Sequence, residues 1–249
     1  MSAILEIKDL WGGYQEGVDI LRGISMEVQQ GEAVGIIGLN GSGKSTLGKA
    51  IMGMIPYRRG SIVFEGEDIT GLKTHELAHR GISIMQQGGR VFPNLTVWDN
   101  LQLAAQANNS KFNIQNSELR EIIPLLQRPK HDLQRLMADK LSGGQKHQLS
   151  LAMTLATHPR LVVLDEPSAG LSPIAVEEMY TMLRKICNCF GLTIVLIEQN
   201  IARAIEFCYS SNPCFHGRCF LLNLGKIEHI FDKDDMLNVK EIEMIMFKK

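Results

Sequence analysis

Several features that would assign a location or a partner at once are missing from this sequence. The N-terminus lacks the basic region and long apolar run of a secretory signal peptide, and no uninterrupted apolar segment reaches about 18 residues. We therefore expect neither an export leader nor a membrane-spanning helix. An excess of one charge is missing too, because 26 basic residues stand against 27 acidic ones, for a net charge of −1. No global positive field predicts nucleic-acid binding.

Cysteine pairs with metal-ligand spacing are also absent. The five cysteines include no C-x-x-C pair, and a cytosolic chain would keep them reduced. Cys208, Cys214, His216 and Cys219 have side chains that bind zinc, but their spacing fits no common zinc pattern. There is no internal repeat and no low-complexity tail. What remains is an ordinary globular composition, 45% apolar and 21% charged, in 249 residues, enough for one large domain or two lobes that share a core.

The strongest motif present is a glycine-rich loop between a predicted strand and a predicted helix. Residues 32–37 are a short apolar run typical of a buried strand, and residues 46–54 have the length and apolar content of a helix. Between them the sequence matches G-x-x-x-x-G-K-[ST], in which backbone N–H groups, a helix dipole and a lysine converge on a phosphate. The loop therefore predicts a nucleotide-phosphate site, made of Gly38, Asn40, Gly41, Ser42, Gly43, Lys44, Ser45 and Thr46.

Two carboxylates follow a later strand that is apolar throughout. Residues 161–164 suit a central parallel strand, and Asp165 and Glu166 come at its carboxyl end, where open α/β sheets bind ligands. A strand ending in two acids is common by chance. With a phosphate loop upstream, the pair predicts a Mg²⁺ ligand and a base that activates water. Gln87, after the predicted strand 82–85, is a weaker candidate to reach a bound metal or water.

Two further segments each have a ligand-binding and a purely structural interpretation. Leu141-Ser142-Gly143-Gly144-Gln145 opens a helix predicted over 146–157, and is either a second phosphate-binding helix N-terminus or only a cap. Tyr14, in Trp11-Gly12-Gly13-Tyr14, either stacks on an adenine ring or is a core aromatic at the end of a strand. Spacing alone does not choose between these alternatives.

The remaining segments predict short strands around the loop and a helical region in the middle of the chain. Thr96 is predicted as an N-cap, with Asp99 in the capping-box position, near the start of a helical insert over 92–140. Residues 56–60 predict a turn. The other expected elements are strands at 4–7, 24–28, 61–64, 192–197, 220–224 and 226–230, helices at 73–80, 174–186, 201–208 and 236–247, and a polar loop at 108–116.

Taken in order, the phosphate loop, Gln87, the Leu-Ser-Gly-Gly-Gln pentad and Asp165-Glu166 resemble the ATP-binding cassette (ABC) ATPases over essentially the whole chain. The pentad is that family's own signature, and other P-loop proteins lack it. The resemblance implies an α/β P-loop NTPase of the ABC ATPase type in a single domain, 1–249. Its parallel core sheet would carry an N-terminal antiparallel β-subdomain and a helical subdomain inserted at 92–140.

The resemblance also implies a role for each motif residue. Lys44 and the loop amides would hold the β- and γ-phosphates of ATP, while Ser45, Gln87 and Asp165 would hold Mg²⁺. Glu166 would orient and polarise the attacking water. Gln87 would sense the metal and the water and relay their state to the helical subdomain.

The resemblance implies that this chain contacts two nucleotides, its own ATP and one held by a second chain. Tyr14 would stack on the adenine of its own ATP, whereas Ser142, Gly143, Gly144 and Gln145 would touch the γ-phosphate held by a facing subunit. Each ATP in this family lies between two cassettes arranged head to tail. A chain with one phosphate loop and one signature therefore needs a partner cassette, identical or different.

Within the family, segments 89–97, 166–173 and 197–200 look like the ATPases of branched-chain amino acid importers and of the related urea and amide importers. Gln199 stands where most ABC ATPases have a histidine that contacts the γ-phosphate, and Ser172 stands where an aspartate is usual. Glutamine still donates a hydrogen bond but cannot become cationic, so hydrolysis should survive with a weaker switch contact.

Two departures from the importer pattern have no assigned role. Residues 210–217 resemble a short insertion, and Lys146-His147-Gln148 is a less usual continuation of the signature. Neither touches the proposed chemistry.

The importer resemblance implies a cytoplasmic ATPase subunit, peripheral on the cytoplasmic face of the cell membrane. It would drive solute uptake through separate integral membrane permease subunits and, indirectly, an extracytoplasmic solute-binding protein. Residues 88–105 would receive the permease, or else form a solvated helical face. The sequence does not name the solute or the partner cassette.

Two other classes remain as alternatives. Soluble ABC ATPases of DNA repair place a long coiled coil between phosphate loop and signature, where this chain has only residues 46–141, and ribosomal members carry two cassettes. A regulatory cassette would bind ATP without turnover, but Lys44 and Glu166 are both present.

Overall fold

The computed structural model describes residues 3–106, 119–209 and 217–232. The polar loop expected at 108–116 and the helix expected at 236–247 lie outside the described residues.

The insertion at 210–217 likewise lies outside them except for Gly217. The chain forms two compact units, Met1–Leu77 with Leu192–Lys249 and Ala78–Gly191. The domain bounds expected from sequence, 1–249 with an insert at 92–140, stay predictions.

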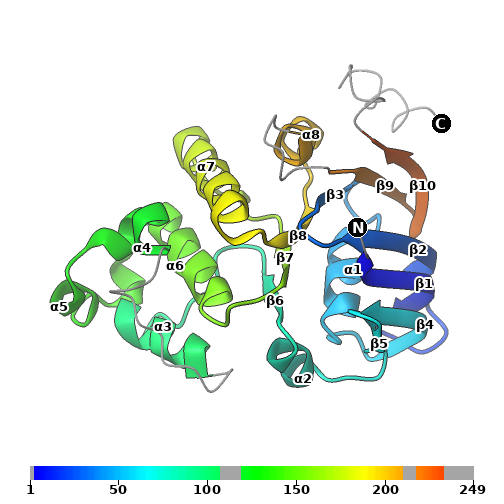
Figure 1. Ribbon diagram of the computed structural model, residues 1–249, viewed down its shortest axis with the longest axis horizontal. Coiled ribbons are helices and arrows are strands. Elements are labelled where there is room, and N and C mark those ends of the chain that lie inside the picture. The colour runs from blue at the N-terminus through cyan, green and yellow to red at the C-terminus, as the bar shows by residue number, and fades with distance from the viewer. Residues whose placement is uncertain (1–2, 107–118, 210–216, 233–249) are drawn as a thin grey trace. The chain divides into compact units, whose positions relative to one another are not determined.

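An antiparallel sheet in the order β2-β1-β4-β5 forms one part of the first unit (Figure 1). From Ile24 to Val28 in β2 every second residue is buried, as expected for a strand with one face on the core. The expected N-terminal antiparallel β-subdomain is therefore present. Its strands are β1 (Ala3–Gly13), β2 (Leu21–Gln29), β4 (Tyr57–Phe64) and β5 (Glu67–Asp68).

The turn expected at 56–60 is wrong, because β4 begins at Tyr57 and pairs with the second half of β1. Glycines that usually indicate a turn here allow two strands to approach closely. A Cβ on Gly12 would stand 2.6 Å from the carbonyl oxygen of Tyr57, and one on Gly60 would stand 2.2 Å from that of Asp9. A local sequence pattern cannot distinguish this use of glycine from a turn, because the contact is made with another strand.

The other strands of the first unit follow the order β10-β9-β3-β8. β3 pairs in parallel with β8 and β9, and β9 and β10 form the expected antiparallel hairpin. Helix α8 packs on β3 and β9, and α1 packs on β8 (Figure 1). The parallel core of the predicted fold class is confirmed. The elements are β3 (Ala33–Ile37), α1 (Lys44–Ile51), β8 (Thr193–Ile197), α8 (Ile201–Tyr209), β9 (Cys219–Asn223) and β10 (Lys226–Phe231).

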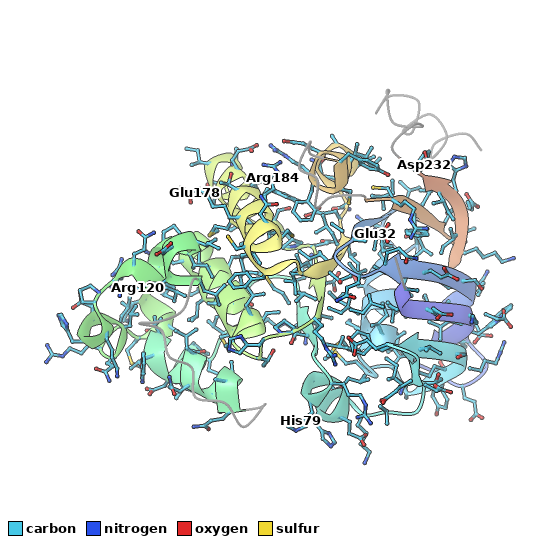
Figure 2. All side chains as sticks on the ribbon, viewed as in Figure 1. Glu32, His79, Arg120, Glu178, Arg184 and Asp232 are labelled. Atoms are coloured by element: carbon cyan, nitrogen blue, oxygen red, sulfur yellow. The ribbon has the colours of Figure 1, made fainter. Side chains whose placement is uncertain are left out.

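An ion pair between Glu32 and Arg218 links the residue before β3 to the residue before β9. The Arg218 guanidinium donates from Nε to Glu32 Oε1 at 2.8 Å and from Nη2 to Glu32 Oε2 at 3.0 Å. The Glu32 side chain, labelled in Figure 2, is buried. The hydrogen bond between Arg218 and Glu32 raises the pKa of the Arg218 guanidinium. Two parallel hydrogen bonds set direction as well as distance, so this pair fixes the strand that leads into the phosphate loop.

Leu224, in the turn between β9 and β10, has a φ of 44°, in the left-handed region. Its side chain is 69% exposed, so packing does not offset a backbone cost of about 1–2 kcal/mol. Leu224→Asn is expected to raise the free energy of unfolding by about 0.5–1 kcal/mol, because asparagine tolerates this conformation. Denaturant titration measures it. Ile230→Asn, at a half-exposed strand position, is the control, and a gain shared by both variants would contradict the explanation.

The second unit holds a pair of parallel strands, β6 and β7, with helices around them (Figure 1). Helix α6 packs on α3 and on β6, and α7 packs on α4. The elements are β6 (Ile82–Met85), α3 (Val97–Gln106), α4 (Leu119–Ile122), η1 (Pro124–Gln127), α5 (Lys130–Leu133), η2 (Ala138–Lys140), α6 (Gly143–Leu155), β7 (Leu161–Asp165) and α7 (Pro173–Phe190). The short helix α2 (Thr74–His79) contains the boundary between the units.

Helix α3 begins as its sequence predicts. The Asp99 N–H donates to Thr96 Oγ1 at 3.0 Å, and the Thr96 hydroxyl donates to Asp99 Oδ2 at 2.6 Å. Thr96 is thus the N-cap, although Asp99 accepts from the hydroxyl and not from the backbone as a full capping box requires. Within the described ranges, no helix combines the length and apolar character needed to cross a membrane.

Candidate active site

The phosphate loop lies in the first unit, between β3 and α1. β3 is buried over its whole length and leads directly into the loop. Gly41 and Gly43 have φ values of 79° and 106°, which glycine adopts without steric cost. A Cβ on Gly38 would stand 2.2 Å from the carbonyl oxygen of Leu222. The loop therefore follows a path that requires glycine at these positions.

The N-terminus of α1 is suited to an anion. Its N-cap, Gly43, has no side chain to accept the first N–H groups, and the first turn contains no acidic residue. The N–H groups at the positive end of a helix dipole attract phosphate. A Cβ on Gly41 would meet no atom within 4 Å, and Ser42 Oγ is buried without a hydrogen-bond partner among the described residues. Open space, a helix N-terminus without a side-chain cap and an orphaned hydroxyl fit a polyphosphate.

Lys44, the first residue of α1, points its ammonium back at the loop. Nζ donates to the carbonyl oxygens of Gly38 at 2.8 Å and Leu39 at 3.0 Å, and the residue is 4% exposed. A phosphate oxygen would be a stronger partner than these neutral carbonyls, because hydrogen bonds between two ions are roughly twice as strong. Ser45 and Thr46 follow in the same helical turn, half-buried and buried respectively.

Gln199, which the family resemblance places at the γ-phosphate, contacts Asn40 of the phosphate loop, and this particular contact was not predicted from the sequence. Its Nε2 donates to Asn40 Oδ1, and both side chains are exposed. The contact arises because β8 pairs in parallel with β3, so that both strands end at the same edge. Beside it the buried carboxylate of Glu198 accepts the Gln199 N–H at 3.1 Å. Glu198 was given no role from sequence, and only the strand pairing could have indicated one.

Tyr14 follows directly after β1 and is 47% exposed. The alternative of a core aromatic therefore does not hold. The Lys49 ammonium, from the last turn of α1, lies 5.7 Å from the centre of the Tyr14 ring. An exposed ring beside the helix of the phosphate loop is well placed to stack on a planar base.

The carboxylates and Gln87 lie in the second unit. Asp165 is buried at the carboxyl end of β7, and Glu166 follows with a φ of 48°. A non-glycine residue in this region costs of order 1–3 kcal/mol, and such residues cluster at functional sites. Gln87 Nε2 donates to Glu166 Oε2 at 2.6 Å, because β6 and β7 are parallel and both residues follow their strand ends. The structure therefore brings Gln87 and Glu166 together.

The signature segment forms a complete capping box at the start of α6. The Gln145 N–H donates to Ser142 Oγ at 3.3 Å, and the Ser142 N–H donates to Gln145 Oε1 at 3.1 Å. The capping interpretation is thus realised, and the first turn carries no acidic residue that would repel an anion.

An open hollow of about 720 Å³ lies beside the signature, within the second unit. Ser142, Gly143, Gly144 and Gln145 line it together with Ser172, which is the N-cap of α7 and accepts the Ala175 N–H at 3.4 Å. Serine at 172 therefore performs the capping that an aspartate would also perform. Glu178, from the same helix, also lines the hollow and is labelled in Figure 2.

The predicted site residues thus fall into two groups. The first unit holds Tyr14, the phosphate loop and Gln199; the second holds Gln87, Asp165, Glu166 and the signature. His147, which has no role assigned from the sequence, is 5% exposed and lies against Gly89, two residues after Gln87. Its burial could not be predicted from a polar run of sequence.

The family model and the similar proteins all indicate the same family. The family model described as ABC transporter matches residues 21–169. The branched-chain amino acid transport ATP-binding protein BraG of Pseudomonas aeruginosa is 32% identical, over 85% of this chain and 89% of its own length. The probable branched-chain amino acid transport ATP-binding protein LivF of Archaeoglobus fulgidus is 33% identical, over 86% and 89%. The lipopolysaccharide export system ATP-binding protein LptB of Acidithiobacillus ferridurans is 31% identical, over 91% and 89%.

Solved structures share the fold. A nucleotide-free ATP-binding cassette from an ABC transporter superposes with a TM-score of 0.78 at 24% identity, over 99% of this chain and 100% of that one. The ATP-binding subunit of another ABC transporter superposes with a TM-score of 0.76 at 27% identity, over 98% and 100%.

Proposed function

This chain belongs to the ABC transporter family as one of its ATPases, and we propose that it powers the import of a small solute through separate membrane permease subunits. The solute class we propose is branched-chain and other hydrophobic amino acids, with urea and amides as the related possibility. The subunit would act at the cytoplasmic face of the membrane, with an extracytoplasmic binding protein delivering the solute.

The observation that carries this proposal is the phosphate loop with its open helix N-terminus, in a chain similar to BraG and LivF along most of its length. Lys44 and the first N–H groups of α1 would hold the β- and γ-phosphates. Tyr14 would stack on adenine. Gln199, which already contacts Asn40, would turn its amide to the γ-phosphate.

Hydrolysis would be carried by the residues at the ends of β6 and β7. Glu166 would accept a proton from the water that attacks the γ-phosphorus, while the bond from that phosphorus to the bridging oxygen breaks and ADP leaves. Gln87, whose Nε2 lies 2.6 Å from Glu166 Oε2, would orient that water. Ser45, Gln87 and Asp165 have the oxygen ligands that Mg²⁺ prefers, and the metal, when bound, supplies charge neutralisation of the phosphates. The strained φ of Glu166 supports a role that needs this carboxylate in a fixed direction.

The signature residues would act on a second nucleotide. A phosphate entering the hollow beside Ser142–Gln145 meets a helix N-terminus without nearby acid in its first turn. Because one chain has one phosphate loop and one signature, the working unit would be two cassettes, head to tail, with an ATP at each contact. A sister ATPase and a second copy of this chain both satisfy that geometry.

Lipopolysaccharide export is a second candidate, favoured by 31% identity to LptB over 91% of this chain. The two candidates use the same ATPase chemistry, and they differ in the membrane subunits that the cassette contacts. Gln199 and Ser172 depart from the histidine and aspartate usual in the family, within segments that look like the importer ATPases, and so favour import.

Deleting the gene and restoring it as wild type or as Lys44→Ala separates these candidates. We expect uptake of labelled leucine, isoleucine and valine, or of urea, to be lost on deletion and restored by the wild type alone. A polytopic membrane protein should co-purify with the wild type. Unchanged uptake together with loss of surface lipopolysaccharide would instead support the export candidate.

A further inference from the structure

His147 fills the space between the glycine turn after β6 and the first turn of α6. Gly88 and Gly89 have φ values of 87° and 59°, and a Cβ on Gly89 would stand 2.8 Å from His147 Nδ1 and 3.0 Å from the His147 backbone nitrogen. Nδ1 also lies 3.0 Å from the carbonyl oxygen of Gly143, to which it donates, since a carbonyl only accepts. One ring therefore contacts the glycine turn and the signature at once.

The other end of the glycine turn holds Gln87, whose amide donates to Glu166 at 2.6 Å. From Glu166 through Gln87, Gly88 and Gly89 to His147, every step is a covalent bond or a close contact within the second unit. The Gly89 end of this path has little room to yield, because the His147 ring is 5% exposed and Gly89 leaves no room for a side chain. A displacement of Gln87 that carries Gly89 with it therefore moves the ring.

Only one of the two ring nitrogens of His147 has a hydrogen-bond partner among the described residues. Nε2 is buried and has no hydrogen-bond partner in the part of the chain that the structure describes. Leaving a buried polar group unsatisfied costs about 1–3 kcal/mol, so packing alone would be served better by an apolar residue. An orphaned buried nitrogen is expected where a contact is exchanged between two arrangements.

We propose that His147 is a positioning residue that couples the two nucleotide sites of the working dimer. This rests on the proposed function, in which Glu166 and Gln87 serve one ATP and the signature of the same chain serves the other. When Gln87 exchanges its bond to Glu166 for a bond at the hydrolysis site, the glycine turn shifts. His147 passes the shift to the Gly143 carbonyl, and so to the signature.

The test compares His147→Ala with His147→Asn. Each variant is made in the full chain and assayed in the intact complex that co-purifies with it. The asparagine amide can still donate to the Gly143 carbonyl, whereas alanine removes both the donor and the packing. For the wild type we expect a Hill coefficient for ATP hydrolysis above 1 and up to about 2, the limit for two sites. His147→Ala should bring it to about 1 and lower kcat, with half-saturating ATP nearly unchanged, and His147→Asn should restore much of the cooperativity.

Leu149→Ala is the matched control, because it removes buried packing from a different face of the same helix. It should lower the melting temperature and leave the Hill coefficient unchanged. Wild-type cooperativity in His147→Ala, or an equal loss in all three variants, would overturn the inference. A wild type that hydrolyses ATP without cooperativity would also overturn it and leave the proposed function standing, whereas absence of hydrolysis would refute the proposed function itself.

Discussion

Glu166→Gln is expected to bind ATP normally, to accumulate as a closed dimer with ATP between its subunits, and to lose turnover by about 10²–10⁴-fold, the usual contribution of a general base. The substitution is nearly isosteric, and the new amide oxygen can still accept the hydrogen bond from Gln87 that the carboxylate now accepts at 2.6 Å. The strained turn at residue 166 would therefore be kept and only the basicity removed. Phosphate release and size-exclusion chromatography with ATP measure the two effects.

Glu121→Gln provides the control for this experiment, because Glu121 is an exposed carboxylate in α4 outside the proposed chemistry. It should hydrolyse ATP as the wild type does. Continued rapid hydrolysis by Glu166→Gln would falsify the catalytic assignment, and would direct attention to Asp165 and Gln199 as the groups that activate water.

Lys44→Ala is expected to weaken ATP binding by about 10–100-fold, which corresponds to the loss of one hydrogen bond to a charged group at about 1.5–3 kcal/mol. The ammonium carries a full positive charge in the loop, and its present partners include the neutral carbonyls of Gly38 and Leu39. Removing it leaves the helix N-terminus as the source of attraction for phosphate. Isothermal titration with ATP measures the affinity.

Lys73→Ala is the matched control for the lysine experiment, since Lys73 is exposed in the same unit and outside the phosphate loop. Its affinity should equal that of the wild type. Equal affinities for Lys44→Ala and the wild type would contradict the phosphate-binding role, provided that thermal unfolding shows both variants folded.

Much of the fold and of the candidate site followed from local sequence patterns. The buried run at 161–164 became β7, the loop at Gly38 led from a strand into a helix, and Thr96 capped α3 as expected. The loop and the cap hold because each depends on hydrogen bonds and φ values within a few residues. The strand holds because a short, continuous apolar run is itself the signal of a buried strand.

The misses share another physical cause. The turn expected at 56–60 is part of β4 because Gly12 and Gly60 admit a neighbouring strand, a contact that no window of sequence contains. The burial of His147 behind Gly89 was likewise unpredicted, since it depends on how α6 packs on β6.

The sequence by itself determined the chemistry of this protein, because the phosphate loop and the capped signature helix are built from neighbours in the chain. Tertiary structure alone decided which distant side chains meet. Gln87 and Glu166 are 79 residues apart and Gln199 and Asn40 are 159 apart, and each pair meets because parallel strands end at a common edge. Parallel pairing joins residues that are remote in sequence, so its contacts leave no local pattern from which to predict them.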